Sequence, residues 1–297
     1  MTIRKIALIG FGEVGQTLAR DLAERNDAEL SAYDLKFDDP DSIPSLAAAR
    51  APVRKTASAA AAVADADIII SAVTANSTRE AAASASSEIK TSAWYFDVNS
   101  SSPATKLATG AIIEDMGGRF VEASIMSPIF PHRIEAPILL GGARAREFEA
   151  VAKSIGFINA KFYSDESGKA AAAKLCRSVI VKGLEALISE SMLAAKHFGV
   201  EGEVISSLEN LFPHPDWRNH ARYMISRSLQ HGERRAEEMR EASRTVAEAG
   251  VEPWMANATV MRQAFAGSLN AGYEIQDLDG LIASMQEKIA AVATNSG

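Results

Sequence analysis

The sequence predicts an α/β domain built on a doubly wound parallel sheet, followed by an all-helical domain. In the first half of the chain, short runs rich in β-branched residues alternate with longer, alanine-rich segments. This alternation is typical of a parallel sheet covered by helices. After about Asp165, apolar residues recur at three- and four-residue spacing, which is typical of helices alone. We therefore expect a first domain over residues 1–164 and a second over residues 165–297.

The same patterns place the individual elements. The expected strands are Lys5–Ile9, Glu29–Tyr33, Asp67–Val73, Trp94–Val98, Phe120–Ala123, Ile138–Leu140 and Asn159–Tyr163. The expected helices of the first domain are Val14–Arg25, Ser58–Ala64, Thr78–Ser86, Pro103–Thr109 and Arg146–Ile155. Those of the second are Lys169–Phe198, Trp217–His231, Arg234–Ala249, Trp254–Ala266 and Leu278–Ala293. Two prolines in Phe212–Trp217 predict a break in the helical pattern there.

Composition narrows the class of protein. A net charge of −7 and a pI near 5.4 argue against nucleic acid or an anionic membrane surface as the partner, because both attract basic proteins. A small molecule is the expected ligand. Cys176 is the only cysteine, so no internal disulfide can form. No apolar run approaches the length of about 18 residues that a membrane span needs, and we expect a cytoplasmic protein. The five histidines show no metal-binding spacing, so no metal site is expected.

The most specific local pattern is the glycine-rich turn Gly10-Phe11-Gly12-Glu13-Val14-Gly15. It follows an apolar strand and opens an amphipathic helix, which is the context of a Rossmann-type dinucleotide-binding motif. There, the glycine backbone and the helix N-terminus can face a pyrophosphate without obstruction by side chains. The second strand ends in Asp34, which is placed to bind the ribose hydroxyls of the adenosine half.

Two features bear on the choice of cofactor and on its second half. An acid at Asp34 repels a 2′-phosphate and favours NAD, whereas Lys36 keeps NADP open. The strand ending at Val73 runs into the polar turn Thr74–Ser77, at the sheet edge where ligands bind. Val73 and Thr74 could therefore contact the cofactor, while Ser77 could simply cap the next helix.

A second polar segment follows the Trp94–Val98 strand at the same edge. The side chains of Asn99, Ser100 and Ser101 could hold a substrate carboxylate. Ser102 precedes Pro103 and is expected to be the N-cap of the next helix, with the proline at its first position.

Three motifs taken in order resemble the β-hydroxyacid dehydrogenases. They are the glycine turn Gly10–Gly15, Phe96-Asp-Val-Asn-Ser-Ser-Ser-Pro103 and Gly168-Lys-Ala-Ala-Ala-Ala-Lys174. The stretch Arg227–Met239 is similar to the helical domain of a less characterised subgroup like 6-phosphogluconate dehydrogenase. The resemblance implies a nicotinamide cofactor, a substrate-binding strand-end motif, and Lys174 as the catalytic acid and base.

The residues around Lys174 fit that role independently. Oxidation of an alcohol by hydride transfer needs a base for the hydroxyl proton, and a lysine with a lowered pKa can supply it. Lys174, Ser178 and Lys182 follow each other at helical spacing and form one polar stripe on an otherwise apolar helix. Ser178 stands where relatives commonly carry an asparagine, and we expect it to orient the substrate oxygen. The alternative is a lysine face that is merely solvated.

The sequence also departs from the resemblance. Relatives often carry a glycine-rich loop where this chain has Ser124–Arg133, which offers His132 and Arg133 as anion binders or as exposed loop residues. They also carry a lysine–aspartate pair that contacts substrate, whereas this chain has Glu237–Glu238. The nearby basic residues, from His231 to Arg235, could reach an active site or make i,i+4 pairs with these acids. These departures leave the substrate open.

Together these features predict an NAD(P)-dependent dehydrogenase that acts on a small hydroxy acid, with Lys174, Ser178 and Ser100 as catalytic residues. Asn99, Ser101, Lys182, His132 and Arg133 are the expected substrate-binding residues. The alternatives are an imine reductase of the same architecture and a dinucleotide-sensing protein without turnover. The resemblance and the apolar faces of the long helices predict a homodimer.

Overall fold

The computed structural model describes residues 3–25, 27–211 and 216–294. The chain forms two compact units, residues 1–174 and 175–297, and the boundary falls inside one long helix. No helix of the described residues combines the length and the hydropathy needed to cross a membrane.

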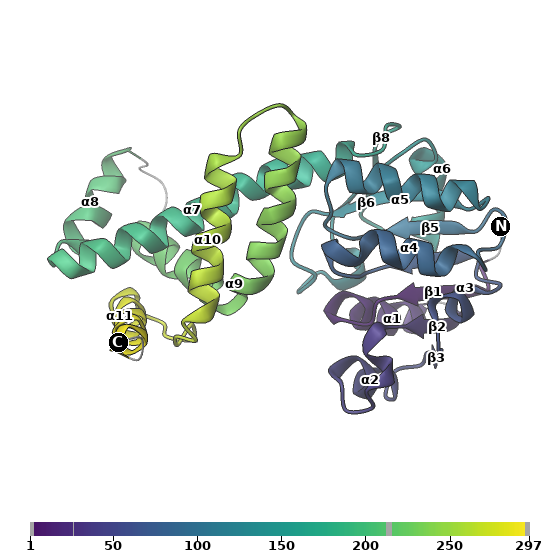
Figure 1. Ribbon diagram of the computed structural model, residues 1–297, viewed down its shortest axis with the longest axis horizontal. Helices are drawn as coiled ribbons and strands as arrows, with labels where there is room; N and C mark the ends of the chain where they lie inside the picture. The colour runs from purple at the N-terminus through teal and green to yellow at the C-terminus, as the bar shows by residue number, and fades with distance from the viewer. Residues whose placement is uncertain (1–2, 26, 212–215, 295–297) are drawn as a thin grey trace. The chain divides into compact units, whose positions relative to one another are not determined.

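The first unit is built on a single eight-stranded sheet (Figure 1), in the order β3-β2-β1-β4-β5-β6-β7-β8. The strands are β1 (Lys5–Ile9), β2 (Glu29–Tyr33), β3 (Arg54–Lys55), β4 (Ile68–Ser71), β5 (Trp94–Asp97), β6 (Arg119–Ile125), β7 (Ile138–Gly141) and β8 (Ala160–Ser164). All neighbouring pairs are parallel except β6 and β7. The order reverses between β1 and β4, and a doubly wound sheet binds its ligand at such a point.

Helices cover both faces of the sheet. They are α1 (Glu13–Arg25), α2 (Ile43–Ala48), α3 (Ala59–Val63), α4 (Thr78–Ser86), α5 (Pro103–Asp115) and α6 (Ala145–Ser154), with short 3-10 turns at Leu35–Asp38, Ala75–Ser77 and Arg133–Glu135. Successive residues of a strand point to opposite faces, so Ile6 and Leu8 belong to one core and Ala7 and Ile9 to the other. All four residues from Ile6 to Ile9 are buried, which explains why the strand is apolar after Lys5.

The predicted doubly wound α/β fold with a helical C-terminal part is confirmed. The sheet is parallel except at one pair, because β7 returns antiparallel to β6, with Glu122 opposite Gly141. The short elements α2 and β3 were not predicted. Helix α5 extends beyond its predicted end at Thr109 and passes through Gly110. That glycine does not end the helix, because its missing side chain makes room for the ring of Phe120, where a Cβ would lie 2.9 Å from Cδ1.

The second unit is helical. The long helix α7 (Lys169–Phe198) has the predicted limits and runs from the first unit into the second. It is followed by α8 (Glu201–Leu211), α9 (Trp217–Glu248), α10 (Trp254–Ser268) and α11 (Leu278–Thr294). Helix α8 was not predicted, and residues 212–215 of the predicted break lie outside the described residues. The two predicted helices, Trp217–His231 and Arg234–Ala249, are joined in α9 across a kink at His231, whose angles are not helical (φ −127°, ψ 15°).

A close contact of two backbones holds α9 against α10 next to that irregular residue. Gly232 on α9 faces Gly267 on α10. A Cβ on Gly232 would lie 2.4 Å from the carbonyl oxygen of Gln263 and 2.4 Å from the backbone nitrogen of Gly267. Because no side chain fits there, the two helices can approach only if residue 232 is glycine.

We therefore predict that Gly232→Ala lowers the free energy of unfolding by about 1–3 kcal/mol, the usual cost of overpacking. The matched control is Gly202→Ala on α8, where nothing lies within 4 Å of the new Cβ. There we expect no loss and a gain of up to about 1 kcal/mol from helix propensity. Urea denaturation of both variants measures the difference, and equal stabilities would contradict the close contact.

Candidate functional site

The glycine turn between β1 and α1 is shaped by close backbone contacts. Gly10 has φ +93°, and its N–H donates to the carbonyl of Tyr33 at 2.8 Å. A Cβ at this position would lie 2.3 Å from the carbonyl oxygen of Ala72. Gly15 is equally constrained, because its Cβ would lie 2.1 Å from the carbonyl oxygen of Gly10. These two glycines therefore allow the turn and the helix to pack on the strand ends.

Gly12 differs from its neighbours because nothing lies within 4 Å of the Cβ it could carry. The space over its backbone is thus open at the N-terminus of α1. A helix N-terminus with an open glycine backbone is the arrangement that receives a pyrophosphate. The three glycines consequently have the three roles that a dinucleotide motif requires, and the residues present fit this group.

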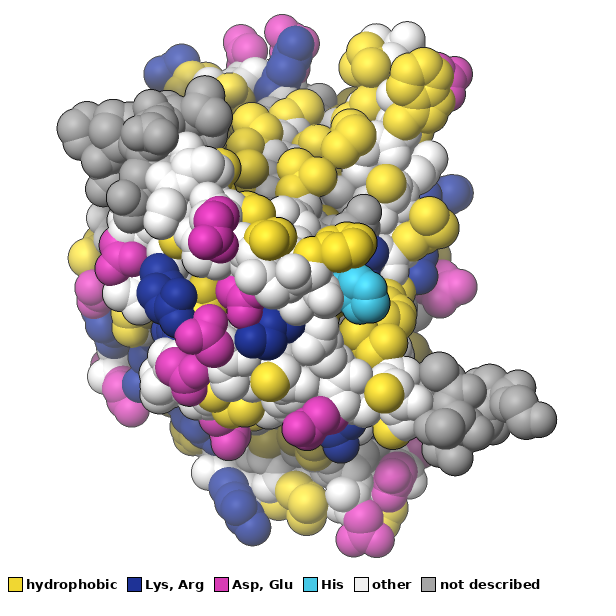
Figure 2. All heavy atoms as spheres, turned by 90° about the vertical axis from the view of Figure 1, so that its left-hand side faces the viewer, with side chains coloured by type: hydrophobic (Ala, Val, Ile, Leu, Met, Phe, Trp, Pro, Cys, Tyr) yellow, Lys and Arg dark blue, Asp and Glu magenta, His cyan; other side chains and the backbone are white. Residues whose placement is uncertain are grey.

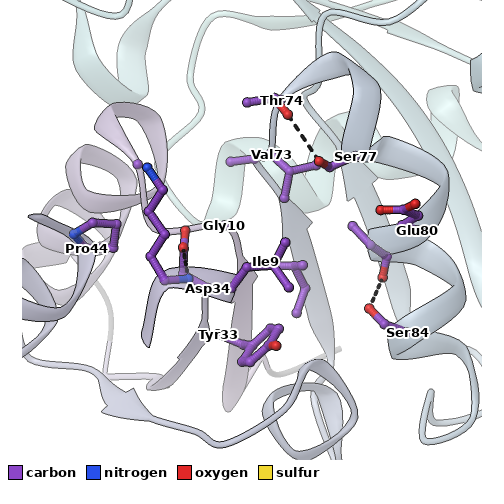
Figure 3. A pocket seen from close by; sticks show the side chains of 15 residues that line it. Ile9, Gly10, Tyr33, Asp34, Pro44, Val73, Thr74, Ser77, Glu80 and Ser84 are labelled. Carbon is purple, nitrogen blue, oxygen red and sulfur yellow. Dashed lines mark hydrogen bonds between the residues drawn. The ribbon is translucent and has the colours of Figure 1, made fainter. Parts of the chain in front are cut away.

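A cavity of about 390 Å³ opens beside this turn (Figure 3). Its wall includes six of the predicted cofactor residues, namely Gly10, Gly12, Asp34, Lys36, Val73 and Thr74. Thr74 and Ser77 face each other on one side, with their hydroxyl oxygens 3.2 Å apart. Ser77 is the N-cap residue of α4, as expected, but its side chain makes no capping hydrogen bond.

Asp34 also holds the turn in place. One oxygen of its carboxylate accepts the N–H of Phe11 at 2.7 Å, and the other accepts the N–H of Lys36 at 2.9 Å. The ring of Phe11 is fully buried in the core, 5.9 Å from that of Phe37, so only its backbone faces the turn. Glu13 is exposed and Val14 is half-buried at the start of α1.

Asn99 ties the next strand end to the same wall. Its side-chain oxygen accepts the N–H of Val73 at 2.7 Å, and its Nδ2 donates to Ser71 Oγ at 2.9 Å. Only 3% of Asn99 is exposed, and both ends of its amide take part in these bonds. Asn99 thus sets the position of the residue that follows β4.

The structure brings Ser100 and Lys174 together. Lys174 Nζ donates to Ser100 Oγ at 2.6 Å, and both residues are half-buried. Ser101 is buried beside them, and its hydroxyl has no hydrogen-bond partner among the described residues. Ser102 caps α5 by accepting the N–H of Thr105, and Pro103 is the first helical residue, so the predicted cap is confirmed.

The start of α7 is shaped to allow this meeting. Gly168 has φ +92°, and a Cβ on it would lie 3.1 Å from Cβ of Pro103. Glycine therefore lets the first turn of α7 pack against the segment that carries Ser100. Lys174, six residues further along, lies in the second turn of this helix.

Three buried charged residues next to this site were not predicted: Asp97, Lys106 and Glu122. Lys106 Nζ lies 3.1 Å from Asp97 Oδ1 and donates to the Asp97 carbonyl at 2.9 Å, and both side chains are fully buried. Glu122 is also fully buried and accepts the N–H groups of Gly168 and Ala171. Burial raises the pKa of Glu122, and the ammonium of Lys106 opposes that rise. An acid within the apolar run Phe120–Ala123 was the available signal.

Comparisons with known proteins place this site in a family. Residues 5–94 match a model described as NADP oxidoreductase, coenzyme F420-dependent, and residues 195–265 match a domain of unknown function (DUF1932). A conserved hypothetical protein from Sinorhizobium meliloti 1021 is 34% identical, with 97% of each chain covered and a TM-score of 0.76. A search of curated proteins finds no match.

Two further solved structures carry the name of an activity. Conserved protein MTH1747, described as structurally similar to 3-hydroxyacid dehydrogenases, is 30% identical, with 89% of this chain and 97% of that chain covered and a TM-score of 0.69. A 3-hydroxyisobutyrate dehydrogenase of Mycobacterium tuberculosis is 18% identical, with 96% and 99% covered and a TM-score of 0.70, a likeness of fold. The chain belongs to the β-hydroxyacid dehydrogenase superfamily. It is an oxidoreductase whose first unit binds a nicotinamide dinucleotide.

The end of the Ser124–Arg133 loop, which departs from the superfamily pattern, is bound to Asp21 of α1. The guanidinium of Arg133 forms an ion pair with Asp21, and the N–H of Ile134 donates to the same carboxylate at 3.0 Å. His132 is exposed. The structure therefore pairs Arg133 with α1 and not with Ser100.

In the second unit, Lys182 is paired with an acid. Its Nζ lies 2.6 Å from Glu238 Oε2 and 3.3 Å from Ser178 Oγ. Only 9% of Lys182 is exposed. Glu238 also forms the i,i+4 pair with Arg234 that the sequence suggested, at 2.8 Å. Glu238, which stands at the position of the aspartate in the lysine–aspartate pair of the relatives, thus neutralises Lys182.

Two further basic residues of the His231–Arg235 segment are shielded from solvent: Arg235 is buried and His231 is half-buried. Arg235 forms a buried ion pair with Glu185 of α7. Burial and the charges of Arg227, Arg234 and Arg235 lower the pKa of His231 to about 4. Among the described residues, no group of three or more His, Cys, Asp or Glu side chains is arranged to hold a metal ion.

The open backbone at Gly12 leads to a prediction about cofactor binding. Gly12→Ala should fold normally, because its Cβ meets no atom, yet it should weaken NADH or NADPH binding at least tenfold, because the methyl group occupies the space left for the pyrophosphate. Fluorescence titration and thermal melting measure the two properties. Unchanged affinity in a folded variant would show that the dinucleotide does not pass over Gly12.

Proposed function

We propose that this protein is a dehydrogenase that oxidises the hydroxyl group of a small hydroxy acid, with Lys174 as the proton acceptor. The observation that carries the proposal is the contact of 2.6 Å between Lys174 Nζ and Ser100 Oγ. It places a titratable amine and a hydroxyl group side by side, just beyond the strand edge that carries the dinucleotide motif. Such a pair can hold and deprotonate an alcohol.

The two residues have separate tasks in this mechanism. The bound nicotinamide supplies the hydride acceptor for the carbon that bears the hydroxyl. Lys174, in its neutral form, takes the hydroxyl proton, so the substrate loses one hydride and one proton and becomes a carbonyl compound. Ser100 orients the substrate oxygen toward the amine by hydrogen bonding. In the reverse direction the ammonium of Lys174 returns the proton.

The neighbouring polar groups support this assignment. The buried hydroxyl of Ser101 has no hydrogen-bond partner among the described residues and is suited to bind a substrate oxygen. Asn99 contributes by fixing Val73 rather than by presenting a free amide. Ser178 and Lys182 follow Lys174 by one and two turns of α7, and we assign them to the substrate as well. Arg133 is left out, because its guanidinium pairs with Asp21, whereas the exposed His132 stays a proposed anion binder.

We further propose NAD as the preferred cofactor. The carboxylate of Asp34 lines the cavity, and a negative charge there repels the 2′-phosphate of NADP. Lys36, also on the wall, is the one lining cation among the described residues that favours the phosphate. The acid is held by two backbone N–H groups, whereas Lys36 is exposed at the rim. Because Asp34 is held in place, its repulsion of a 2′-phosphate should outweigh the attraction of the exposed Lys36.

A screen of hydroxy acids, aldonates and their phosphates with NAD and NADP tests the reaction. On the substrate it identifies, Lys174→Ala should lower kcat at least 100-fold, the size of a lost general base, with cofactor affinity unchanged. The control is Lys169→Ala in the first turn of α7, whose side chain is 57% exposed and should tolerate the change. Activity near wild type in Lys174→Ala would refute the mechanism.

The same screen separates the rival functions. Reduction of cyclic imines without oxidation of any hydroxy acid would identify an imine reductase. Binding of NADH or NADPH without turnover of any compound would identify a dinucleotide-sensing protein.

We also propose that the protein is a homodimer joined through its helical unit. Figure 2 shows hydrophobic side chains spread over the visible surface of that unit. The large exposed apolar residues include three on α7 and three on α10: Ile180, Leu184, Leu187, Trp254, Met261 and Phe265. Exposed apolar surface of this extent on two helices is typical of an interface.

Light scattering should therefore give twice the mass of one chain. Leu187→Glu should weaken the dimer at least tenfold, because it puts a charge into an apolar contact. Leu107→Glu on α5 is the matched control, since Leu107 and Leu187 are 55% and 54% exposed. A monomeric wild-type protein would contradict the proposal.

A further inference from the structure

We propose that Glu122 is the positioning residue for Lys174, because its buried carboxylate supplies the side-chain cap that the N-cap residue of α7, a glycine, cannot supply. The inference rests on the proposed role of Lys174 and adds the residue that places it. Glu122 comes from β6, far from α7 in the sequence, and acts only through the helix.

The cap is incomplete without this carboxylate. The carbonyl of Gly168 accepts the first helical hydrogen bond, from the N–H of Ala172 at 2.9 Å, so Gly168 is the N-cap residue. Ser, Thr, Asp or Asn at this position would bond the exposed N–H groups of the first turn. Glycine has no side chain to do so. Instead, one oxygen of Glu122 accepts the N–H of Gly168, and the other accepts that of Ala171 at 2.5 Å.

Gly168 cannot be exchanged for a capping residue. Its φ of +92° disfavours any side chain, and Pro103 leaves only 3.1 Å to a Cβ. The close packing that brings α7 to the Ser100 segment therefore removes the usual cap. Glu122 supplies the same pair of hydrogen bonds that a capping box makes, from a different element.

Glu122 is itself held rigidly. It is fully buried, and a Cβ on Gly141 of β7 would lie 2.9 Å from its Oε2, so Gly141 leaves the room for the carboxylate. Lys106 is the nearby cation, and it pairs with Asp97 at 3.1 Å. A fixed acceptor on the sheet thus fixes the first turn of α7.

The consequence for Lys174 follows from its place in the helix. It lies three residues after Ala171, less than one turn from the last N–H that Glu122 holds. Ser100 lies on the segment after β5, which belongs to the same sheet. The 2.6 Å contact between Lys174 and Ser100 therefore depends on the angle at which Glu122 holds the first turn.

The test follows Lys174 without any substrate. Glu122→Gln replaces one carboxylate oxygen by an NH₂ group, which cannot accept a hydrogen bond from the backbone N–H of Gly168 or Ala171. Trinitrobenzenesulfonate labelling, read by peptide mass spectrometry, should modify Lys174 at least tenfold faster in this variant than in the wild type. Lys182, mostly buried further along α7, should keep its rate. On the substrate found by the screen, kcat should fall at least tenfold while the KM for the cofactor stays within twofold.

The matched control is Asp67→Asn. Asp67 is another buried carboxylate that accepts two backbone N–H groups, those of Arg4 at 2.8 Å and Lys5 at 3.2 Å, at the start of β1. This variant should leave Lys174 labelling and kcat as in the wild type. An equal effect in Asp67→Asn would overturn the inference, because it would reflect general loosening of the unit.

Further outcomes decide the matter. Wild-type labelling of Lys174 in Glu122→Gln overturns the inference, even if Lys174→Ala is inactive and the proposed reaction stands. Faster labelling of Lys182 as well overturns it too. If Glu122→Gln does not fold, Gly141→Ala displaces the carboxylate without removing it, and unchanged labelling of Lys174 there is equally decisive. If Lys174→Ala retains activity, the proposed reaction fails while the labelling still reports on placement.

Discussion

The buried ion pair between Lys106 and Asp97 is the interaction on which the architecture of the site depends. Both side chains are fully buried, and an ion in that setting is tolerated only when it is paired and hydrogen-bonded. Removing one partner of such a pair typically costs about 3–5 kcal/mol. Lys106 on α5 therefore packs against Asp97 at the end of β5. The ammonium of Lys106 also opposes the rise in the pKa of Glu122 on β6 and so offsets part of the cost of burying that carboxylate. The carboxyl edge of the sheet is built around these charges.

Hydrogen bonds connect this ion pair both to the cavity beside the glycine turn and to the start of α7, which carries Lys174. Asp97 Oδ1 accepts the N–H of Asn99 at 2.9 Å, and Asn99 in turn holds Val73, which lines the cavity. On the other side, Glu122 holds the start of α7 and hence Lys174. Hydrogen bonds that start from one buried pair thus set both the residue beside the dinucleotide and the proposed proton acceptor. This connection ties a site built from loops and helix ends to the sheet by hydrogen bonds.

The helical unit distributes its charges in an unusual way. Glu185 and Arg235 are buried within it as an ion pair, and burial raises the pKa of Glu185 while Arg235 opposes the rise. Large apolar side chains of α7 and α10 lie on its surface instead. Helices that bury charges and expose apolar residues suit an interface with another chain, which is why the dimer proposal concerns this unit. The Lys182–Glu238 pair adds a second ion pair with little exposure to solvent to this unit.

The sequence by itself determined the fold class, most strands, the full extent of α7 and the glycine turn. These features depend on local periodicity and on glycines within a few residues of each other, so they can be recognised without knowing what lies nearby. Only the tertiary structure decided the antiparallel direction of β7 and the buried group of Asp97, Lys106 and Glu122. The same holds for the ion pairs Arg133–Asp21 and Lys182–Glu238. Asp97 and Lys106 are nine residues apart, and the other partners are further apart in the chain. An acid in an apolar strand is visible in the sequence, but the helix that it caps becomes known only when the sheet has brought Glu122 to Gly168.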